Sequence, residues 1–178
     1  MKTVLTREEF GALFEAFSES AFRLETLDVY TAPSEADEYR RFLDGEELPT
    51  TGESGWVQFV KRAVGQGKVI QRVHAISRPL TPYLKYEIEW GYVYTSLAGE
   101  DIRLINRAEL SPELSGLADF WLFDRKTLII VRYDSAGRFL HGEKEDSPEA
   151  VKVHIDYCAL LISQATPLRA FLAQERGA

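Results

Sequence analysis

Hydrophobic residues recur at helical spacing through most of the first 67 positions. The capping box Thr6–Glu9, in which a hydroxyl and a carboxylate bind free backbone amides, predicts that a helix begins at Thr6. Its apolar face is formed by Phe10, Leu13, Phe14 and Phe17. We expect two more helices over Ser34–Leu43 and Trp56–Val64, with an extended segment, Ala21–Tyr30, before them. Residues 1–67 are therefore predicted to be the helical N-terminal part of a single domain.

The hydrophobic period changes after residue 68. Short strands are predicted at Val69–Ile76, Ile102–Ile105, Asp119–Phe123, Leu128–Tyr133 and Arg138–Glu143. Thr81-Pro82 favours the start of a helix that reaches about Leu97, and Ser147-Pro148 favours the start of the last long helix. Because short strands alternate with helical connections, we expect an α/β (mixed α+β) fold. Residues 68–178 would form a mixed sheet of about five or six strands with helices on both faces, preceded by the N-terminal helical extension.

Composition excludes several classes of protein. The chain has 178 residues, 45% hydrophobic and 28% charged, and so can bury a core without metal or disulfide crosslinks. Cys158 is the single cysteine, which excludes an internal disulfide and fits the reducing cytoplasm. The net charge of −7 disfavours direct nucleic-acid binding, and no stretch approaches the ~18 apolar residues of a membrane span. No cofactor or metal is expected, since His74, His141 and His154 lack ligand spacing.

Charged residues that interrupt or flank the predicted strands are the candidates for a ligand site. They are Arg72, Glu87, Glu100, Arg103, Asp119, Asp124 and Arg132. Arginine and carboxylate side chains rarely enter a core unpaired, so we expect ion pairs among these groups. Such pairs either form a buried network that fixes the fold or line a pocket for a small polar or anionic ligand. Opening of the cluster to solvent distinguishes the two.

Aromatic residues supply a candidate surface for a protein partner. They make up 12% of the chain and include the run Trp90-Gly-Tyr-Val-Tyr94. Most aromatic residues belong to a core, but a clustered run can form an exposed patch. We therefore predict a partner surface at Trp90, Tyr92 and Tyr94.

Several phrases along the chain together resemble a family of actinobacterial domains of unknown function. They are Ala21–Tyr30 (AFRLETLDVY), Arg78–Tyr83 (RPLTPY), Tyr86-Glu87, Ala98–Arg103 (AGEDIR) and Asp119–Asp124 (DFWLFD). Genes of that family are common near genes of helix-turn-helix regulators. The resemblance implies a protein partner, with a DNA-binding regulator as the first candidate, and implies no particular chemistry.

The region Gly65–Leu172 also looks like half of a phospholipase-D-type domain. That superfamily carries His-x-Lys-x-x-x-x-Asp on a strand, with the His as nucleophile toward phosphorus and the Lys holding phosphate oxygens. The Asp of this pattern falls on Asp124, whereas Leu117 takes the place of the His and Asp119 that of the Lys. An aliphatic group cannot attack phosphorus and a carboxylate repels phosphate, so the resemblance implies an inactive half-site.

These observations favour a non-catalytic regulatory or protein-interaction module that has a small polar pocket and works beside a helix-turn-helix regulator. The chain has no helix-turn-helix signature or basic recognition helix of its own, so direct reading of DNA is not expected. The sequence leaves a homodimer open. The alternative function is a metal-dependent phosphodiester hydrolase in which Asp119, Asp124 and Glu100 hold Mg²⁺.

Overall fold

Residues 2–49 and 54–177, which the computed structural model describes, contain one mixed sheet of eight strands in the order β1-β7-β6-β5-β2-β3-β4-β8. The strands are β1 (Lys2–Leu5), β2 (Ser20–Glu25), β3 (Val69–Ile76), β4 (Asp101–Asn106), β5 (Phe120–Phe123), β6 (Thr127–Tyr133), β7 (Phe139–Glu145) and β8 (Thr166–Pro167). The pairs β2–β3 and β3–β4 are parallel, and the other pairs are antiparallel. The predicted fold class, α/β (mixed α+β), is confirmed, with more strands than expected.

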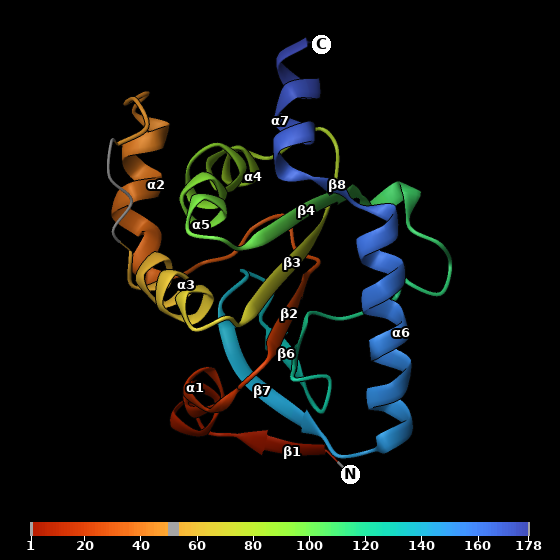
Figure 1. Ribbon diagram of the computed structural model, residues 1–178. Helices are drawn as coiled ribbons and strands as arrows, with labels where there is room; N and C mark the ends of the chain where they lie inside the picture. The colour runs from red at the N-terminus through yellow and green to blue at the C-terminus, as the bar shows by residue number, and fades with distance from the viewer. Residues whose placement is uncertain (1, 50–53, 178) are drawn as a thin grey trace.

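Helices cover both faces of this sheet (Figure 1). They are α1 (Arg7–Ala16), α2 (Ala36–Leu43), α3 (Gly55–Gly65), α4 (Pro82–Tyr86), α5 (Tyr92–Leu97), α6 (Pro148–Gln164) and α7 (Leu168–Gly177), with a π-helical turn, Glu87–Gly91, between α4 and α5. α6 covers one face, where its Cys158 and Leu161 join a core cluster. α1 and α3 cover the other face, where Val60 and Ala63 of α3 join a second cluster.

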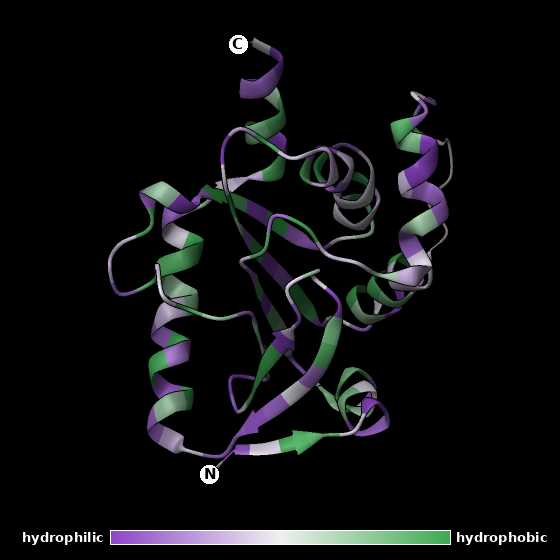
Figure 2. Cartoon of the chain, turned by 180° about the vertical axis from the view of Figure 1, so that it is seen from behind, coloured by the Kyte–Doolittle hydropathy of each residue, from purple (hydrophilic) through white to green (hydrophobic). Residues whose placement is uncertain are grey.

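Hydropathy and capping explain where these helices begin and how they pack. Thr6 accepts a hydrogen bond from the amide of Glu9, and the Glu9 carboxylate accepts one from the amide of Thr6, as the capping box predicts. Ser147 caps α6 by accepting from the amide of Ala150. Figure 2 shows hydrophobic and hydrophilic segments alternating along α6, which is typical of a helix with one buried side. Within the described ranges, none of the helices combines the length and apolar character needed to span a membrane.

The N-terminal part is less helical than predicted. β1 and β2 both fall in residues 1–67 and join the same sheet as the later strands. β1 is an edge strand whose residues are mostly exposed, with Val4 at 62%, so it has no alternation of buried and exposed positions to reveal it. β8, at the opposite edge, is only Thr166–Pro167 and is too short to show a period. These two edge strands account for the difference in strand number.

Candidate functional site

The parallel strands β2 and β3 place four polar side chains on one buried face of the sheet. Arg23 is in register with Arg72, and Glu25 is in register with His74. Residues in register on neighbouring strands point to the same face, here the face that α1 and α3 cover. All four are buried, with exposed fractions between 0% and 9%. Charged groups this deep need partners at close range.

The two arginines form a continuous chain of ion pairs with three carboxylates. Nη2 of Arg23 lies 2.7 Å from Oδ2 of Asp119, and its Nε lies 3.5 Å from Oε1 of Glu25. The same Glu25 oxygen lies 2.7 Å from Nη1 of Arg72, and Nε of Arg72 lies 2.8 Å from Oε1 of Glu100. Both guanidinium groups are therefore balanced by carboxylates within the chain.

Asp119 ties the segment after β2 to this ion-pair chain. Its Oδ1 accepts hydrogen bonds from the amide and the hydroxyl of Thr26, at 2.9 and 2.6 Å. Its Oδ2 accepts one from the hydroxyl of Tyr30 at 2.6 Å. Arg23 also donates to the Tyr133 hydroxyl at 2.9 Å, while its Nη1 has no acceptor within the described residues. Asp119 consequently fixes residues 26–30 above the ends of β2 and β3.

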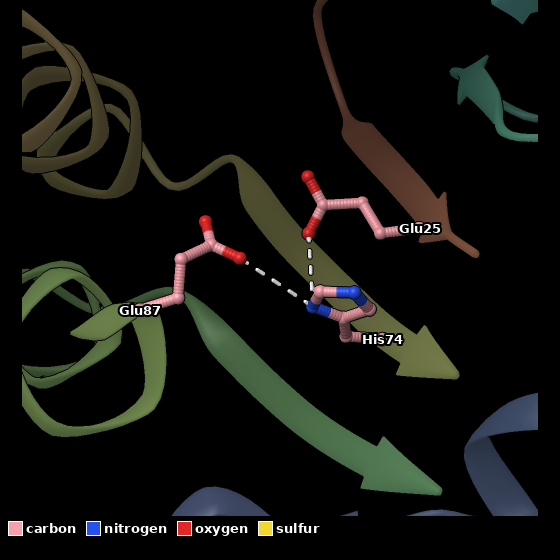
Figure 3. Close-up of side chains that lie close together, drawn as sticks. All are labelled: Glu25, His74 and Glu87. Carbon is pink, nitrogen blue, oxygen red and sulfur yellow. Dashed lines mark ion pairs between the residues drawn. The ribbon is translucent and has the colours of Figure 1, made fainter. Parts of the chain in front are cut away.

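The π-helical turn brings a further carboxylate, Glu87, to the cluster. The amide of Tyr92 donates to the carbonyl of Glu87, five residues earlier, which makes this turn wider than a turn of α-helix. The side chains of Glu87 and Tyr92 consequently meet, with the hydroxyl 3.0 Å from Oε2 of Glu87. The same hydroxyl lies 2.7 Å from Oε2 of Glu25 and 2.7 Å from Nδ1 of His74. Figure 3 shows the two glutamates converging on the imidazole.

One hydroxyl hydrogen cannot satisfy the three groups around Tyr92. Nε2 of His74 lies 2.7 Å from the carbonyl oxygen of Leu27, which can only accept, so Nε2 carries a hydrogen. Burial lowers the pKa of His74 and so favours the neutral ring. The cluster then needs at least one more hydrogen, and the raised pKa of Glu87, caused first by burial, favours a protonated carboxyl group that supplies it. Tyr92 in turn donates within the cluster.

The pKa values of the buried glutamates diverge because their neighbours differ. Burial alone would raise the pKa of Glu25, but the positive charges of Arg72 and Arg23 outweigh burial and hold this pKa below its ordinary value. Burial raises the pKa of Glu87 well above its ordinary value, and the nearby charges of Glu25 and Glu35 raise it further. Burial also raises the pKa of Glu35. Glu25 is therefore ionised, whereas Glu87 and Glu35 resist ionisation.

Two adjoining cavities open beside this cluster. Their volumes are about 490 Å³ and about 450 Å³. The first is walled by aromatic residues, namely Tyr30, Tyr83, Tyr133 and Phe139. The aromatic residues that line the second are Trp56, Tyr86 and Tyr92. The residues that line both are Ser34, Glu35, Arg72 and Glu87. The charged cluster thus has an open side.

Four of the seven residues predicted to form a polar site come together in this cluster: Arg72, Glu87, Glu100 and Asp119. Arg103 and Arg132 do not. Arg103 pairs with its neighbour Asp101, with Nε 3.2 Å from Oδ1, and donates to a backbone carbonyl of α6. Arg132 pairs with Glu143 across the β6–β7 hairpin at 2.9 Å. These two arginines are half-exposed in local pairs, which sequence position alone could not distinguish from buried ones.

Asp124 lies at the opposite end of β5 from Asp119 and has a structural role. Its carboxylate accepts hydrogen bonds from three successive amides, those of residues 18–20, at 2.7 to 2.9 Å. The carboxylates of Asp119, Asp124 and Glu100 therefore do not form one metal site. The alternative function assigned Mg²⁺ to these three residues, and that assignment is wrong. Leu117 packs at the edge of the α6-side core and offers no nucleophile.

The predicted partner surface is largely buried. Trp90 and Tyr92 are 4% and 3% exposed, and only Tyr94 is half-buried. Trp90 packs with Tyr86 and Phe42, and Tyr92 points into the charged cluster. The prediction of an exposed aromatic patch is thus corrected, because the π-helical turn rotates these residues toward the interior.

Glu25, His74 and Glu87 have a geometry that the sequence did not predict. One ligand atom from each lies within 4.8 Å of the others, as in a metal site. The Tyr92 hydroxyl, however, lies 2.7 to 3.0 Å from all three atoms and takes up the space between them. Metal–ligand bonds of about 2.0–2.2 Å would require this hydroxyl to move.

Sequence reasoning missed Arg23, Glu25 and His74 as members of the cluster. A signal was present, because Phe22-Arg23-Leu24-Glu25 alternates apolar and charged residues within an extended segment. That alternation predicts a polar face on this strand. It does not reveal that Arg72 and His74 lie beside this face, because the order of strands in the sheet determines that.

Comparisons with known proteins identify a family and a fold. A family model described as a domain of unknown function (DUF6879) matches residues 8–173. No curated protein matches the sequence significantly. Among solved structures, Nuc from Salmonella typhimurium, a phospholipase D family member, is similar with a TM-score of 0.51 at 10% identity, over 94% of this chain and 98% of Nuc. TrmBL2, an archaeal chromatin protein with a novel mode of DNA binding, is similar with a TM-score of 0.53 at 9% identity, over 93% of this chain and 52% of TrmBL2. At these identities the likeness shows a phospholipase-D-like fold and no more.

Proposed function

The chain belongs to the DUF6879 family of domains of unknown function, and on that premise we propose that it is a ligand-binding regulatory module. A small polar molecule binds in the two joined cavities beside the buried charges of β2, β3 and the π-helical turn. Its presence is communicated to a protein partner. No chemical step is part of this proposal.

One observation carries the proposal: the buried charged cluster opens to the cavities at Arg72 and Glu87. A network whose only role was to fix the fold would be closed on every side by protein. The cavities lie near the carboxyl ends of parallel strands, where ligands bind in open α/β sheets. Their aromatic walls with a few converging polar groups are typical of small-molecule sites.

The first experiment is a ligand screen read as the melting temperature. The panel contains amino acids, amines, carboxylic acids, sugar phosphates and neutral sugars. Ser34 is exposed and lines both cavities, so Ser34→Trp should block them without removing a charge. Ser163→Trp is the matched control, because Ser163 is exposed on α6, which covers the opposite face of the sheet.

We expect at least one compound to raise the melting temperature of the wild type and of Ser163→Trp but not of Ser34→Trp. A ligand at a hundred times its Kd adds about 2.7 kcal/mol of stability, which corresponds to a shift of several degrees. If no compound in the panel shifts the wild type, or if every shift persists in Ser34→Trp, the cavities are not a binding site.

The protein partner is the second part of the proposal. In TrmBL2, a region similar to this chain accounts for about half of a protein that binds DNA. This chain has a net charge of −7, which disfavours DNA contact of its own and favours a separate DNA-binding partner. A pull-down from the native cell should recover a helix-turn-helix regulator, in an amount that differs between wild type and Ser34→Trp. Recovery of no such regulator would contradict this part.

The alternative function, a phosphodiester hydrolase, draws support from the fold. Nuc is a phospholipase D family member with a similar fold. A hydrolase built on this chain would have to use other groups than those first assigned, since Asp119 and Asp124 lie at opposite ends of β5. We therefore rank binding above hydrolysis.

A further inference from the structure

Among the described residues, Glu87 on the cavity wall has no arginine or lysine within ion-pair distance. Its nearest basic group is His74, 3.6 Å away, and burial lowers the pKa of His74 and so favours the neutral ring. Glu87 is 8% exposed and lines both cavities. Its Oε2 lies against Tyr92, but its Oε1 has no hydrogen-bond donor among the residues that the structure describes. Figure 3 shows this second oxygen pointing away from Glu25 and His74. This oxygen is not among the fully buried side-chain atoms, so it is open to the cavities and can take a partner from solvent or from a ligand.

The arginines near the cavities cannot serve as this partner. Arg72 already binds Glu100 through Nε and Glu25 through Nη1, at 2.8 and 2.7 Å. The other arginines that line the first cavity, Arg7 and Arg138, are exposed, and Arg138 already pairs with Asp134. Solvent and salt screen exposed charges, so they offset a buried carboxylate poorly.

The wall of the first cavity combines surplus acid with aromatic rings. Its buried or half-buried charged groups are Glu25, Glu35 and Glu87 against Arg72 alone. Tyr30, Tyr83 and Tyr133 also line this cavity. Carboxylates attract a cation by charge, and aromatic faces attract it through the ring quadrupole. An anion entering the same cavity would meet the ionised Glu25 and two further carboxyl groups against Arg72.

Resting on the proposed function, we infer that the ligand is a small organic cation, a primary amine or a quaternary ammonium, whose charged group binds against Glu87 and Glu35. The apolar part of the cation lies against the tyrosines. A bare metal ion is a poorer occupant, because the cavity of about 490 Å³ far exceeds an ion and the Tyr92 hydroxyl occupies the space between the three possible ligand atoms.

Binding of such a cation should release protons. The groups that face Glu87 are Glu25, Arg72, His74, Tyr92 and Glu35. Burial and the neighbouring carboxylates raise the pKa of Glu87, and burial raises the pKa of Glu35. A bound ammonium favours the ionised form of both, so protons that they hold in the free protein leave on binding.

The test uses three probes with the same four-carbon chain and different charge: butylammonium, 1-butanol and butyrate, with Mn²⁺ as a fourth. Binding is followed by amide chemical shifts in NMR, and proton release by calorimetry in two buffers of different ionisation enthalpy. The variants are Glu87→Gln, Glu89→Gln and Ser34→Trp. Glu89→Gln is the matched control, because Glu89 is exposed on the same turn and the substitution changes the charge equally.

We expect butylammonium to bind at least about tenfold more tightly than 1-butanol, with proton release, and butyrate to bind most weakly. Glu87→Gln should weaken butylammonium about ten- to hundredfold, the usual value of a charge-assisted hydrogen bond. Ser34→Trp should abolish its binding, and Glu89→Gln should leave it unchanged.

Several outcomes would overturn the inference. If butyrate or 1-butanol binds as tightly as butylammonium and Ser34→Trp abolishes that binding, the pocket stands and its preference for cations fails. Mn²⁺ binding that Glu87→Gln abolishes, without butylammonium binding, would replace the organic cation by a metal. If none of the probes binds, the preference for cations fails and the broader ligand screen alone decides whether the cavities bind anything.

Discussion

Glu25 and Glu87 are buried to nearly the same extent, but replacing them by glutamine should change the stability of the protein in opposite directions. Glu25 is 7% exposed and bound by two arginines, whereas Glu87 is 8% exposed and bound by none. Burial disfavours the charged form of both, so their neighbours decide which one ionises. The difference between them separates a residue that stabilises the fold from one that is available to a ligand.

Glu25→Gln should destabilise the protein strongly. The substitution removes the charge that Arg23 and Arg72 share, and the loss of one partner of a buried pair costs about 3–5 kcal/mol. The free energy of unfolding at pH 7, measured in urea, checks this. A loss below about 1 kcal/mol, the usual value of a solvent-exposed ion pair, would show that Glu25 contributes little to holding the two arginines in the core.

Glu87→Gln should stabilise the protein above neutral pH. A carboxyl with a raised pKa holds its proton in the folded state at pH values where the unfolded chain has lost it. The folded state then binds more protons, so its stability falls as the pH rises above the ordinary value of 4.5. The glutamine variant lacks this fall, and each unit of raised pKa corresponds to about 1.4 kcal/mol.

Unfolding measured at pH 4.5 and pH 8 checks the sign of this effect. The variant should match the wild type at the lower pH and exceed it at the higher one. Glu89→Gln should show no such difference, because Glu89 is exposed. A Glu87→Gln protein that is less stable than the wild type at pH 8 would contradict an unpaired acid at this position.

At the scale of elements, the β6–β7 hairpin helps to form the wall of the pocket. The amide of Thr31 donates to the carbonyl of Gly137 at 3.0 Å, and the Thr31 hydroxyl donates to the carbonyl of Ala136 at 2.7 Å. Gly137 has φ = +74°, and a Cβ there would lie 2.3 Å from the carbonyl oxygen of Val29. The hairpin and the segment after β2 can approach this closely only with glycine at position 137.

Gly137→Ala should therefore destabilise the protein by about 3 kcal/mol and disturb the pocket. Gly45→Ala is the matched control, because Gly45 has a similar φ of +77° with open space around it. Gly45→Ala should lose only about 1 kcal/mol of stability, because alanine is strained in the left-handed conformation. Stability is measured by urea unfolding. Equal losses of stability in the two variants would show that the close approach of the Val29 carbonyl does not require glycine at position 137.

The carboxylate of Asp124 holds two segments of the chain together and does not belong to the ligand site. Its bonds to the amides of residues 18–20 join the start of β2 to the turn after β5. Asp124→Ala should cost about 2 kcal/mol of stability. Ligand affinity at the pocket should not change, since the pocket lies toward the opposite end of β2. A variant of normal stability that lost ligand binding would reverse this assignment.

Patterns among neighbouring residues predicted most helices and strands well. They predicted only part of the candidate site. The strand predicted at Val69–Ile76 and the caps at Thr6, Thr81 and Ser147 are confirmed because each depends on neighbouring residues alone. The π-helical turn was not predicted, because an i to i+5 hydrogen bond leaves no distinct pattern of apolar positions. That turn determines that Tyr92 faces inward.

At the scale of the whole molecule, strand order decides which charges meet. β2 lies between β3 and β5, so Arg23 reaches Asp119 on one side and shares Glu25 with Arg72 on the other. This order could not be predicted from composition or period, since the strands are separated by long helical connections. The sequence consequently named four members of the cluster and missed the three from β2 and the middle of β3.

The same order makes a prediction about the alternative function. With Mg²⁺ or Mn²⁺ and a generic phosphodiester, any turnover should be unaffected by Asp124→Asn, because Asp124 is occupied by backbone amides. A chromogenic phosphodiester assay on purified wild type and variant measures this. If turnover depends on the metal and Asp124→Asn abolishes it, the protein is a hydrolase that uses Asp124, as the alternative function first assigned.

The proposed site depends on Glu87, a buried acid at the wall of an open pocket that has no arginine or lysine partner among the described residues. The most direct measurement is a carbon NMR titration of the Glu87 side-chain carboxyl in the free protein, assigned with Glu87→Gln. We expect a midpoint well above the ordinary value of 4.5. A midpoint at or below 4.5 would mean that the chain already supplies a positive partner, and would contradict the account.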